Sequence, residues 1–169
     1  MALIKPKYIT IVKSTATHPN EDIALYLARR NAGIDTLYYE KDGILDAKSK
    51  FEIIDLEKFK SLSKGTRDTH FIGLAISSNT NPLCGASVAI TSKYLCDFRW
   101  SCHTGDREEQ ILRRIKKEIS LAFDAVGEGP TPPVVQDCLS IGTKAGLYSA
   151  LLIGALALED NDYATPTNI

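Results

Sequence analysis

The chain has 169 residues, of which 44% are hydrophobic, and its 20 basic and 21 acidic residues give a net charge of −1 at pH 7. This length suits one domain with a buried core, and the balanced charge excludes a strong overall attraction to nucleic acid or an acidic membrane, although not a local basic face. The four cysteines have neither zinc-ligand spacing nor the density of a disulfide framework, which predicts a reducing compartment. No apolar run is long enough to span a bilayer, so we expect a soluble, cytoplasmic protein with no membrane partner.

The N-terminal part predicts short strands joined by turns. Residues 7–13 alternate and are rich in β-branched side chains, as in a strand. Residues 20–33 are ambiguous, because Asn20 can open a helix that Gly33 closes, while the apolar residues between them also alternate as in a strand. Propensity alone slightly favours the helix. Further strands are expected at 35–43, around Phe51 and Ile53 within 48–60, and at 69–78, which suggests an antiparallel meander.

The central part predicts a loop, a long strand and a helix. Residues 79–85 contain the Asn, Pro and Gly of a loop, and residues 87–101 read as one strand. Asp106 with Glu109 forms a capping-box pattern before an apolar stripe at helical spacing, which predicts a helix over 106–125. Its basic residues lie mostly off the stripe and are interpreted as a solvated face in preference to a nucleic-acid contact: Arg113, Arg114, Lys116 and Lys117.

The C-terminal part predicts a second helical region from about 134 to 160, followed by a polar tail. Residues 147–158 are apolar on nearly every side, and a helix of that kind must be buried on every side. A chain of this size has difficulty burying such a helix alone, which favours an assembly over a free monomer. The single expected domain, 1–169, thus divides into a sheet region (1–104), a first helix (105–126) and a second helical region with the tail (127–169).

No motif points to catalysis, a cofactor or a metal. Cys96, Cys102 and His103 are the one cluster that suggests a metal, but Cys96 and Cys102 share a strand face with Trp100, where thiols usually pack, so no metal site is expected. The histidines are scattered and no nucleophile-elbow or phosphate-loop pattern is present, so only a catalytic site assembled by the fold stays open. The strand face that carries Lys93, Asp97 and Arg99, together with the earlier Lys48, Lys50 and Lys60, fits RNA and an ordinary wet sheet face equally well.

Three stretches in order resemble one known family. They are STATHPNEDIALYLARRNAGIDTLYYEKDGI, KFEIIDLEKFKSLSKGTRDTHFIGLAISSN and ASVAITSKYLCDFRWSCHTGDREEQILRRIKKEISLAF. Together they resemble, over roughly residues 7–126, the coat proteins of single-stranded RNA bacteriophages of the levivirus type. The resemblance implies an α+β fold: an antiparallel meander sheet with an N-terminal hairpin, followed by two C-terminal helices, in an interlocked dimer. It also implies a strand, in place of a helix, at 20–33.

The resemblance implies a virion structural protein. Its dimers would assemble into an icosahedral shell in the cytoplasm of a bacterial host and package genomic RNA on the inner sheet face. The RNA-binding residues on that face would be Lys50, Glu52, Phe71, Ser77, Lys93, Asp97 and Arg99. This face is less basic than that of a specific hairpin reader, so non-specific packaging is expected. The inter-subunit loop would contain Asn79, Asn81, Pro82 and Cys84, with Cys84 mostly reduced and only occasionally paired with a neighbouring subunit.

The sequence therefore predicts a bacteriophage coat protein, a capsid subunit whose partners are copies of itself and RNA, with no catalytic residue, cofactor or metal. Two alternatives stay open. The first is a dimeric RNA- or DNA-binding regulator that does not form shells. The second is a small-molecule enzyme with His70 or His103 as a base.

Overall fold

The computed structural model describes residues 3–35, 44–45, 50–64, 68–91, 96–104, 107–127, 129 and 131–159, and every structural statement refers to these residues. The helices in this part are α1 (Glu21–Asn31), α2 (Leu56–Ser63) and α3 (Glu108–Ala125). The strands are β1 (Leu3–Ile4), β2 (Pro6–His18), β3 (Ile44–Leu45), β4 (Glu52–Ile53), β5 (Thr69–Ser78), β6 (Leu83–Thr91), β7 (Cys96–Thr104), β8 (Thr131–Ile141) and β9 (Tyr148–Glu159).

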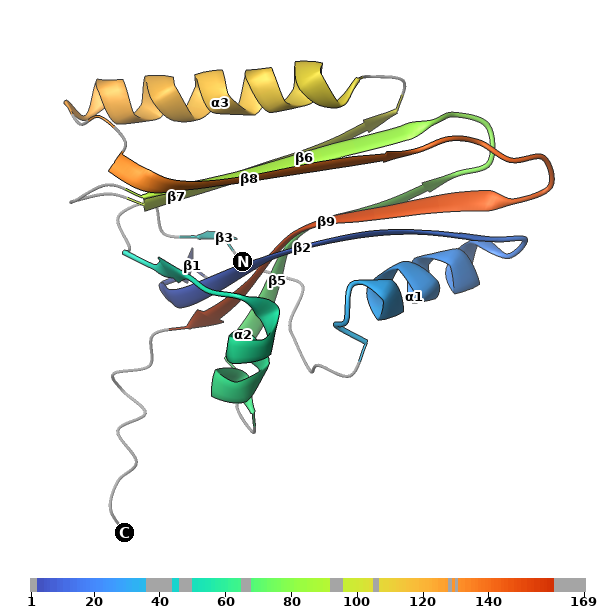
Figure 1. Ribbon diagram of the computed structural model, residues 1–169, viewed down its shortest axis with the longest axis horizontal. Helices are drawn as coiled ribbons and strands as arrows, with labels where there is room; N and C mark the ends of the chain where they lie inside the picture. Colours follow the sequence, from blue (N-terminus) through green and yellow to red (C-terminus); the bar gives the residue numbers. More distant parts are fainter. Residues whose placement is uncertain are drawn as a thin grey trace, which may run out of the picture.

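The main elements form four layers (Figure 1). Helix α3 covers a three-stranded sheet with the strand order β7-β6-β8, and this sheet packs on a four-stranded sheet with the order β4-β2-β9-β5. Helices α1 and α2 cover the other face of the four-stranded sheet. Strands β1 and β3 form a separate parallel pair. Both sheets are therefore covered on both faces, which calls for apolar residues on both sides of their central strands.

Strand β9 is the most deeply buried element. It pairs antiparallel with β2 on one side and with β5 on the other. Leu152 and Leu156 pack in the helix-side core, whereas Leu151 and Ile153 face the other sheet, and all four are at most 1% exposed. The second C-terminal helix predicted from this segment is wrong, because the segment is a strand buried on both faces.

The antiparallel meander followed by two C-terminal helices is therefore wrong as a fold class. Strand β2 pairs with β9, the last strand of the described chain, and β8 and β9 follow α3 where a helix was expected. The single strand predicted at 87–101 is instead two antiparallel strands, β6 and β7, which pair with each other. The interlocked dimer was implied by the same resemblance as the meander fold, and it loses its basis with that fold.

The structure of residues 20–33 decides between the helix and the strand that were both expected there. Residues 21–31 form helix α1, and the side-chain oxygen of Asn20 accepts a hydrogen bond from the backbone N–H of Ile23 at 3.1 Å, which caps the first turn. Ala24 and Ala28 are fully buried against the sheet. The helix favoured by propensity is confirmed, and the strand that the coat-protein resemblance implied here is wrong.

Some of the other predicted elements are confirmed, and others lie outside the described residues. The strands at 7–13 and 69–78 are confirmed within β2 and as β5. The strand expected around Phe51 and Ile53 is confirmed as the two-residue strand β4. It is followed by helix α2, which the carboxylate of Asp55 caps by accepting from the backbone N–H of Lys58 at 2.8 Å. Most of the 35–43 strand lies outside the described residues. Within the described part, no helix is both long and apolar enough to cross a membrane.

Helix α3 is confirmed, with a different first turn from the one expected. Asp106, the expected cap, lies outside the described residues, and the helix cap is Arg107, whose backbone N–H donates to the side-chain oxygen of Gln110 at 3.3 Å. The apolar stripe of α3 packs on one face of β6, and the buried residues of this interface are Cys84, Ala86, Val88, Ile90, Ile111, Ile115, Ile119 and Phe123.

A pair of glycines allows β5 and β9 to approach closely. Gly73 and Gly154 are directly opposite in the register. A Cβ atom on Gly154 would lie 2.4 Å from the carbonyl oxygen of Ile72, and one on Gly73 would lie 2.4 Å from that of Ile153. Backbone atoms cannot rotate away as a side chain can, so only glycine fits at either position without displacing a strand.

We expect Gly154→Ala to lower the free energy of unfolding by about 2 kcal/mol or more, because the added methyl group overpacks against backbone. Urea denaturation followed by circular dichroism measures this change. Gly142→Ala is the matched control, because a Cβ atom there meets nothing within 4 Å. Equal losses in both variants would show that the close strand approach is not the cause.

Candidate functional site

The residues predicted to bind RNA do not share one face. Lys50 and Glu52 lie at or beside β4, at one edge of the four-stranded sheet, whereas Phe71 and Ser77 lie on β5 at its opposite edge. Phe71 is only 7% exposed and packs in the core beneath the helices. The remaining members are Asp97 and Arg99, on β7 of the other sheet, and Lys93, which lies outside the described residues. No common surface therefore unites the members of this set that the structure describes.

The predicted inter-subunit loop is partly a strand. Asn79, Asn81 and Pro82 are exposed in the connection between β5 and β6. Cys84 belongs to β6, where it is 2% exposed and packs beneath α3. A thiol in that position is not presented at the connection, so it is poorly placed to pair with another subunit.

His18 and His70 do not come together in one site, and the side chain of His103, on β7, lies outside the described part of the structure. His18 lies at the end of β2, where its Nδ1 accepts a hydrogen bond from the backbone N–H of Asn20 at 2.9 Å. His70 is 5% exposed at the start of β5, with its Nε2 3.3 Å from a carboxylate oxygen of Glu159. They lie opposite Tyr148 and Ala157, toward the two ends of β9, so they are far apart. In the described part of the chain, no three His, Cys, Asp or Glu side chains gather where a metal ion could bind.

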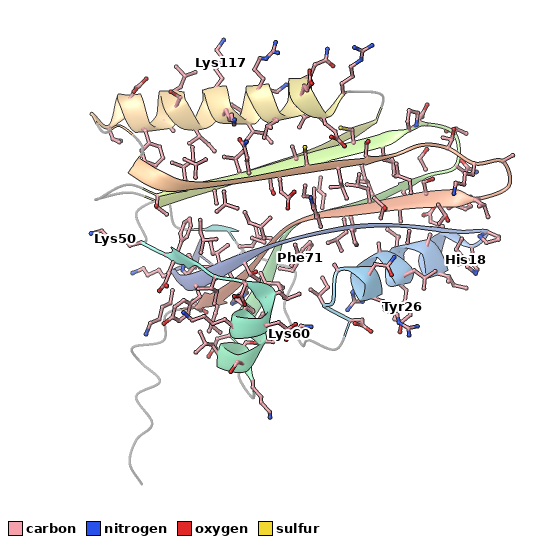
Figure 2. All side chains as sticks on the ribbon, in the orientation of Figure 1. His18, Tyr26, Lys50, Lys60, Phe71 and Lys117 are labelled. Carbon is pink, nitrogen blue, oxygen red and sulfur yellow. The ribbon has the colours of Figure 1, made fainter. Side chains whose placement is uncertain are left out.

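The outward face of α3 carries the densest group of exposed cations on any described helix. Arg113, Arg114, Lys116 and Lys117 are all exposed and occupy little more than one turn. Figure 2 shows Lys117 on the side of α3 that points away from the sheets. We call these four residues the basic ridge. The sequence predicted these residues to lie off the apolar stripe of the helix. In the structure they lie together on the outer surface of α3, which is itself an outermost layer.

Two shallow hollows lie along the basic ridge. One, of about 460 Å³, is lined by Gln110, Arg113, Arg114 and Lys117. The other, of about 260 Å³, is lined by Glu109, Leu112, Arg113 and Lys116. Among the described residues, both hollows are lined by side chains of α3, as depressions between neighbouring side chains along the helix. This geometry suits an extended charged partner better than a buried substrate.

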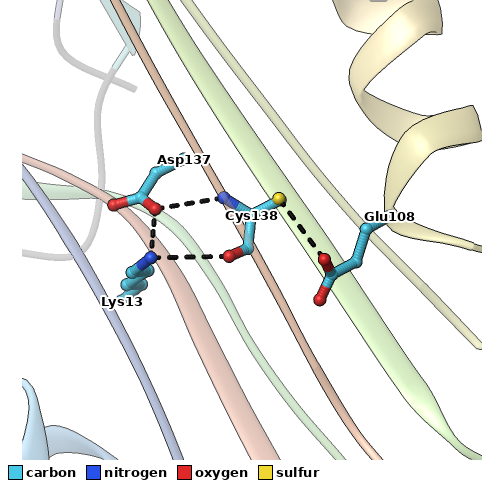
Figure 3. A network of polar contacts seen from close by, with 4 residues as sticks. All are labelled: Lys13, Glu108, Asp137 and Cys138. Atoms are coloured by element: carbon cyan, nitrogen blue, oxygen red, sulfur yellow. Dashed lines mark hydrogen bonds and ion pairs between the residues drawn. The ribbon is translucent and has the colours of Figure 1, made fainter.

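A chain of polar contacts ties α3 to both sheets (Figure 3). The Cys138 thiol on β8 donates to a carboxylate oxygen of Glu108, in the first turn of α3, at 3.4 Å. On the other side of β8, the Lys13 ammonium group of β2 donates to the Asp137 carboxylate, and to the Cys138 carbonyl oxygen at 3.4 Å. The contacts therefore run from the four-stranded sheet through β8 to the helix.

The Lys13–Asp137 contact contributes little stability by itself, because both side chains are about a third exposed, at 39% and 32%. Ion pairs of that exposure contribute about 0–1 kcal/mol. Ser87 on β6 lies directly opposite Asp137 in the register and is fully buried. A substrate in solution does not reach Ser87, and the Lys13 ammonium group is already held by the carboxylate, so these residues do not form an accessible nucleophile and base.

The pKa of the Cys138 thiol is raised above its ordinary value. Burial is the largest cause, followed by the hydrogen bond to Glu108 and the negative charge of that carboxylate. The thiol therefore keeps its proton at neutral pH and can act as the donor in the contact with Glu108. Because the folded protein binds this proton more tightly than the unfolded chain, the resulting stability is present below the ordinary thiol pKa and is lost as the pH rises through the raised one.

We expect Cys138 to react slowly with iodoacetamide between about pH 8 and 9, where a substantial fraction of a free cysteine is thiolate. Glu108→Gln removes the negative charge and should speed the reaction several-fold in that range. Mass spectrometry of the Cys138 peptide measures the rate separately from the other cysteines, and Glu109→Gln is the neighbouring control. An unchanged rate in Glu108→Gln would contradict the contact between the thiol and the carboxylate.

No model of a known protein family matches the chain, and no curated protein is similar to it in sequence. The basic ridge is thus the surface from which a function can be argued. Sequence reasoning identified its residues but judged them an ordinary solvated face. The signal that could have ranked them higher is their density, since cations fill four of the five positions from 113 to 117.

Proposed function

We propose that the protein binds nucleic acid through the basic ridge, chiefly by contacts to phosphate groups. The observation that carries the proposal is the exposure of Arg113, Arg114, Lys116 and Lys117 on the solvent side of an outermost helix. Phosphate contacts supply most of the affinity of sequence-independent nucleic-acid binding, and they require cations that solvent and ligand can reach.

The support of α3 strengthens the proposal. The helix is held by a continuous apolar interface with β6, and its first turn is also tied to β8 through Glu108 and Cys138. A helix fixed in this way keeps its cations in one arrangement, so less conformational entropy is lost when they engage a ligand. A single exposed lysine on a loose segment offers no such advantage.

The net charge of the chain does not oppose this function, because binding depends on the local field. The outward side of α3 also bears the exposed carboxylates Glu109, Glu118 and Asp124. Glu109 precedes the ridge, whereas Glu118 and Asp124 follow it along the helix. They should confine the attractive surface to the middle of α3 and limit the number of phosphates that it contacts.

We expect the double variant Arg113→Gln, Lys117→Gln to lose roughly tenfold in affinity for a mixed-sequence oligonucleotide pool, and to show a shallower dependence on salt. Fluorescence anisotropy of labelled pools measures both quantities. The matched control is Lys64→Gln, Lys144→Gln, which removes the same charge from exposed positions outside α3. Equal losses in both double variants would assign any binding to overall charge, and a wild-type protein that binds no pool would refute the proposal.

The coat-subunit role, with RNA as its cargo and the virion as its location, stays a prediction from the family resemblance. One observation favours assembly: β5 has ten residues and no partner strand on its outer side in the described chain. Such an edge can pair with a second copy. Negative-stain electron microscopy of the purified protein should then show uniform round particles with nucleic-acid absorbance, and a protein that stays monomeric at high concentration would contradict the role.

A further inference from the structure

The shape of the basic ridge limits the kind of nucleic acid that fits it, if the proposed function holds. Helix α3 lies on top of the three-stranded sheet, with its inner side buried and its outer side free of other described layers (Figure 1). It is therefore a convex ridge and not a channel. An α-helix with side chains is about 10–12 Å across, and the major groove of B-form DNA is about 12 Å wide and 8.5 Å deep.

The cations are spread around the ridge in a way that suits a groove with a phosphate chain on each side. At 3.6 residues per turn, Arg114 and Lys116 lie about 160° apart around the helix axis. They therefore occupy opposite flanks, and Arg113 and Lys117 lie on the crest between them. A helix that lay flat on one phosphate strand would gain contacts from only one flank.

The ridge lacks the side chains on which single strands stack. Phe123 is the aromatic residue of α3, and it is 2% exposed in the interface with the sheet. Sequence-tolerant binding of single strands relies on base stacking over aromatic side chains in a basic groove. Double-stranded RNA also fits poorly, because its major groove is too narrow and deep for a helix to enter.

From these observations we infer that the preferred ligand is double-stranded DNA, with α3 in the major groove. Arg114 contacts the phosphates of one strand and Lys116 those of the other. Arg113 faces the groove floor, and Lys117 faces the phosphates at the rim of the groove. Glu109 lies one turn before Arg113 and approaches the backbone on the Lys116 side, where its charge opposes binding.

The test compares four labelled ligands of one sequence: a DNA duplex, the matching RNA duplex, one DNA single strand and one RNA single strand. Each is about 16 base pairs or nucleotides long, which is roughly one and a half turns of duplex DNA. Anisotropy titrations run from roughly 50 to 200 mM salt. We expect the DNA duplex to bind about tenfold more tightly than the other three. The slope of log affinity against log salt should be near −3, and Lys117→Gln should make it shallower by about 0.9.

Two further arms test the placement of the helix. Arg114→Gln and Lys116→Gln should each weaken binding to duplex DNA several-fold, whereas Glu109→Gln should strengthen it and Lys144→Gln should leave it unchanged. A duplex whose cytosines carry a bulky group at C5, which projects into the major groove, should bind more weakly than the plain duplex.

The outcomes separate this inference from the function on which it rests. Binding to none of the four ligands refutes both. Tighter binding to a single strand or to the RNA duplex overturns the inference and leaves the nucleic-acid function standing. Equal binding to the plain and the C5-substituted duplex overturns the major-groove placement.

Discussion

The structure depends on the burial of strand β9, which lies between β2 and β5 within its sheet and between the helices on one face and the other sheet on the opposite face. Its hydrogen bonds hold β2 and β5 in one sheet, and its side chains enter the helix-side core on one face and the inter-sheet core on the other. Complete burial of a Leu or Ile side chain contributes about 1.5–3 kcal/mol, and β9 buries several of them. Without this strand, β2 would lose its main partner, and α1 would lose much of the surface on which it packs.

The same strand shows where reasoning from sequence reached its limit. A short apolar run is consistent with a buried strand and with a buried helix, and periodicity alone cannot separate them. Residues 147–158 lack the polar alternation of a half-exposed strand because both faces are covered. The nearby Gly142 and Gly146 lie in the connection between β8 and β9. Pairing between strands that are far apart in the sequence, such as β2 and β9, leaves no local signal, so the order of strands in the sheet could not have been predicted.

Elements whose stability is encoded locally were predicted well. The stripe of Ile111, Ile115 and Ile119 is a property of the helix itself, and α3 lies where that spacing indicates. At 20–31 the local signal from Asn20 was correct, and the resemblance to coat proteins suggested the wrong element. An order of strands followed by a helix is shared by many folds, so the match in order did not establish a match in pairing. The basic ridge was also visible in the sequence, but its isolation on an outermost layer is a tertiary property.

The pairing of β2 with β9 also has a consequence for how the chain is made. Thr10 pairs with Leu156, so β2 must wait until synthesis has passed Leu156 before its main neighbour exists. Contacts of such long sequence separation slow folding, because a large loop must close before they form. During synthesis, β2 and β5 expose apolar faces and unpaired edges, which makes the nascent chain prone to aggregation and a natural client of chaperones. A protein of this design completes its core only once β9 has been synthesised.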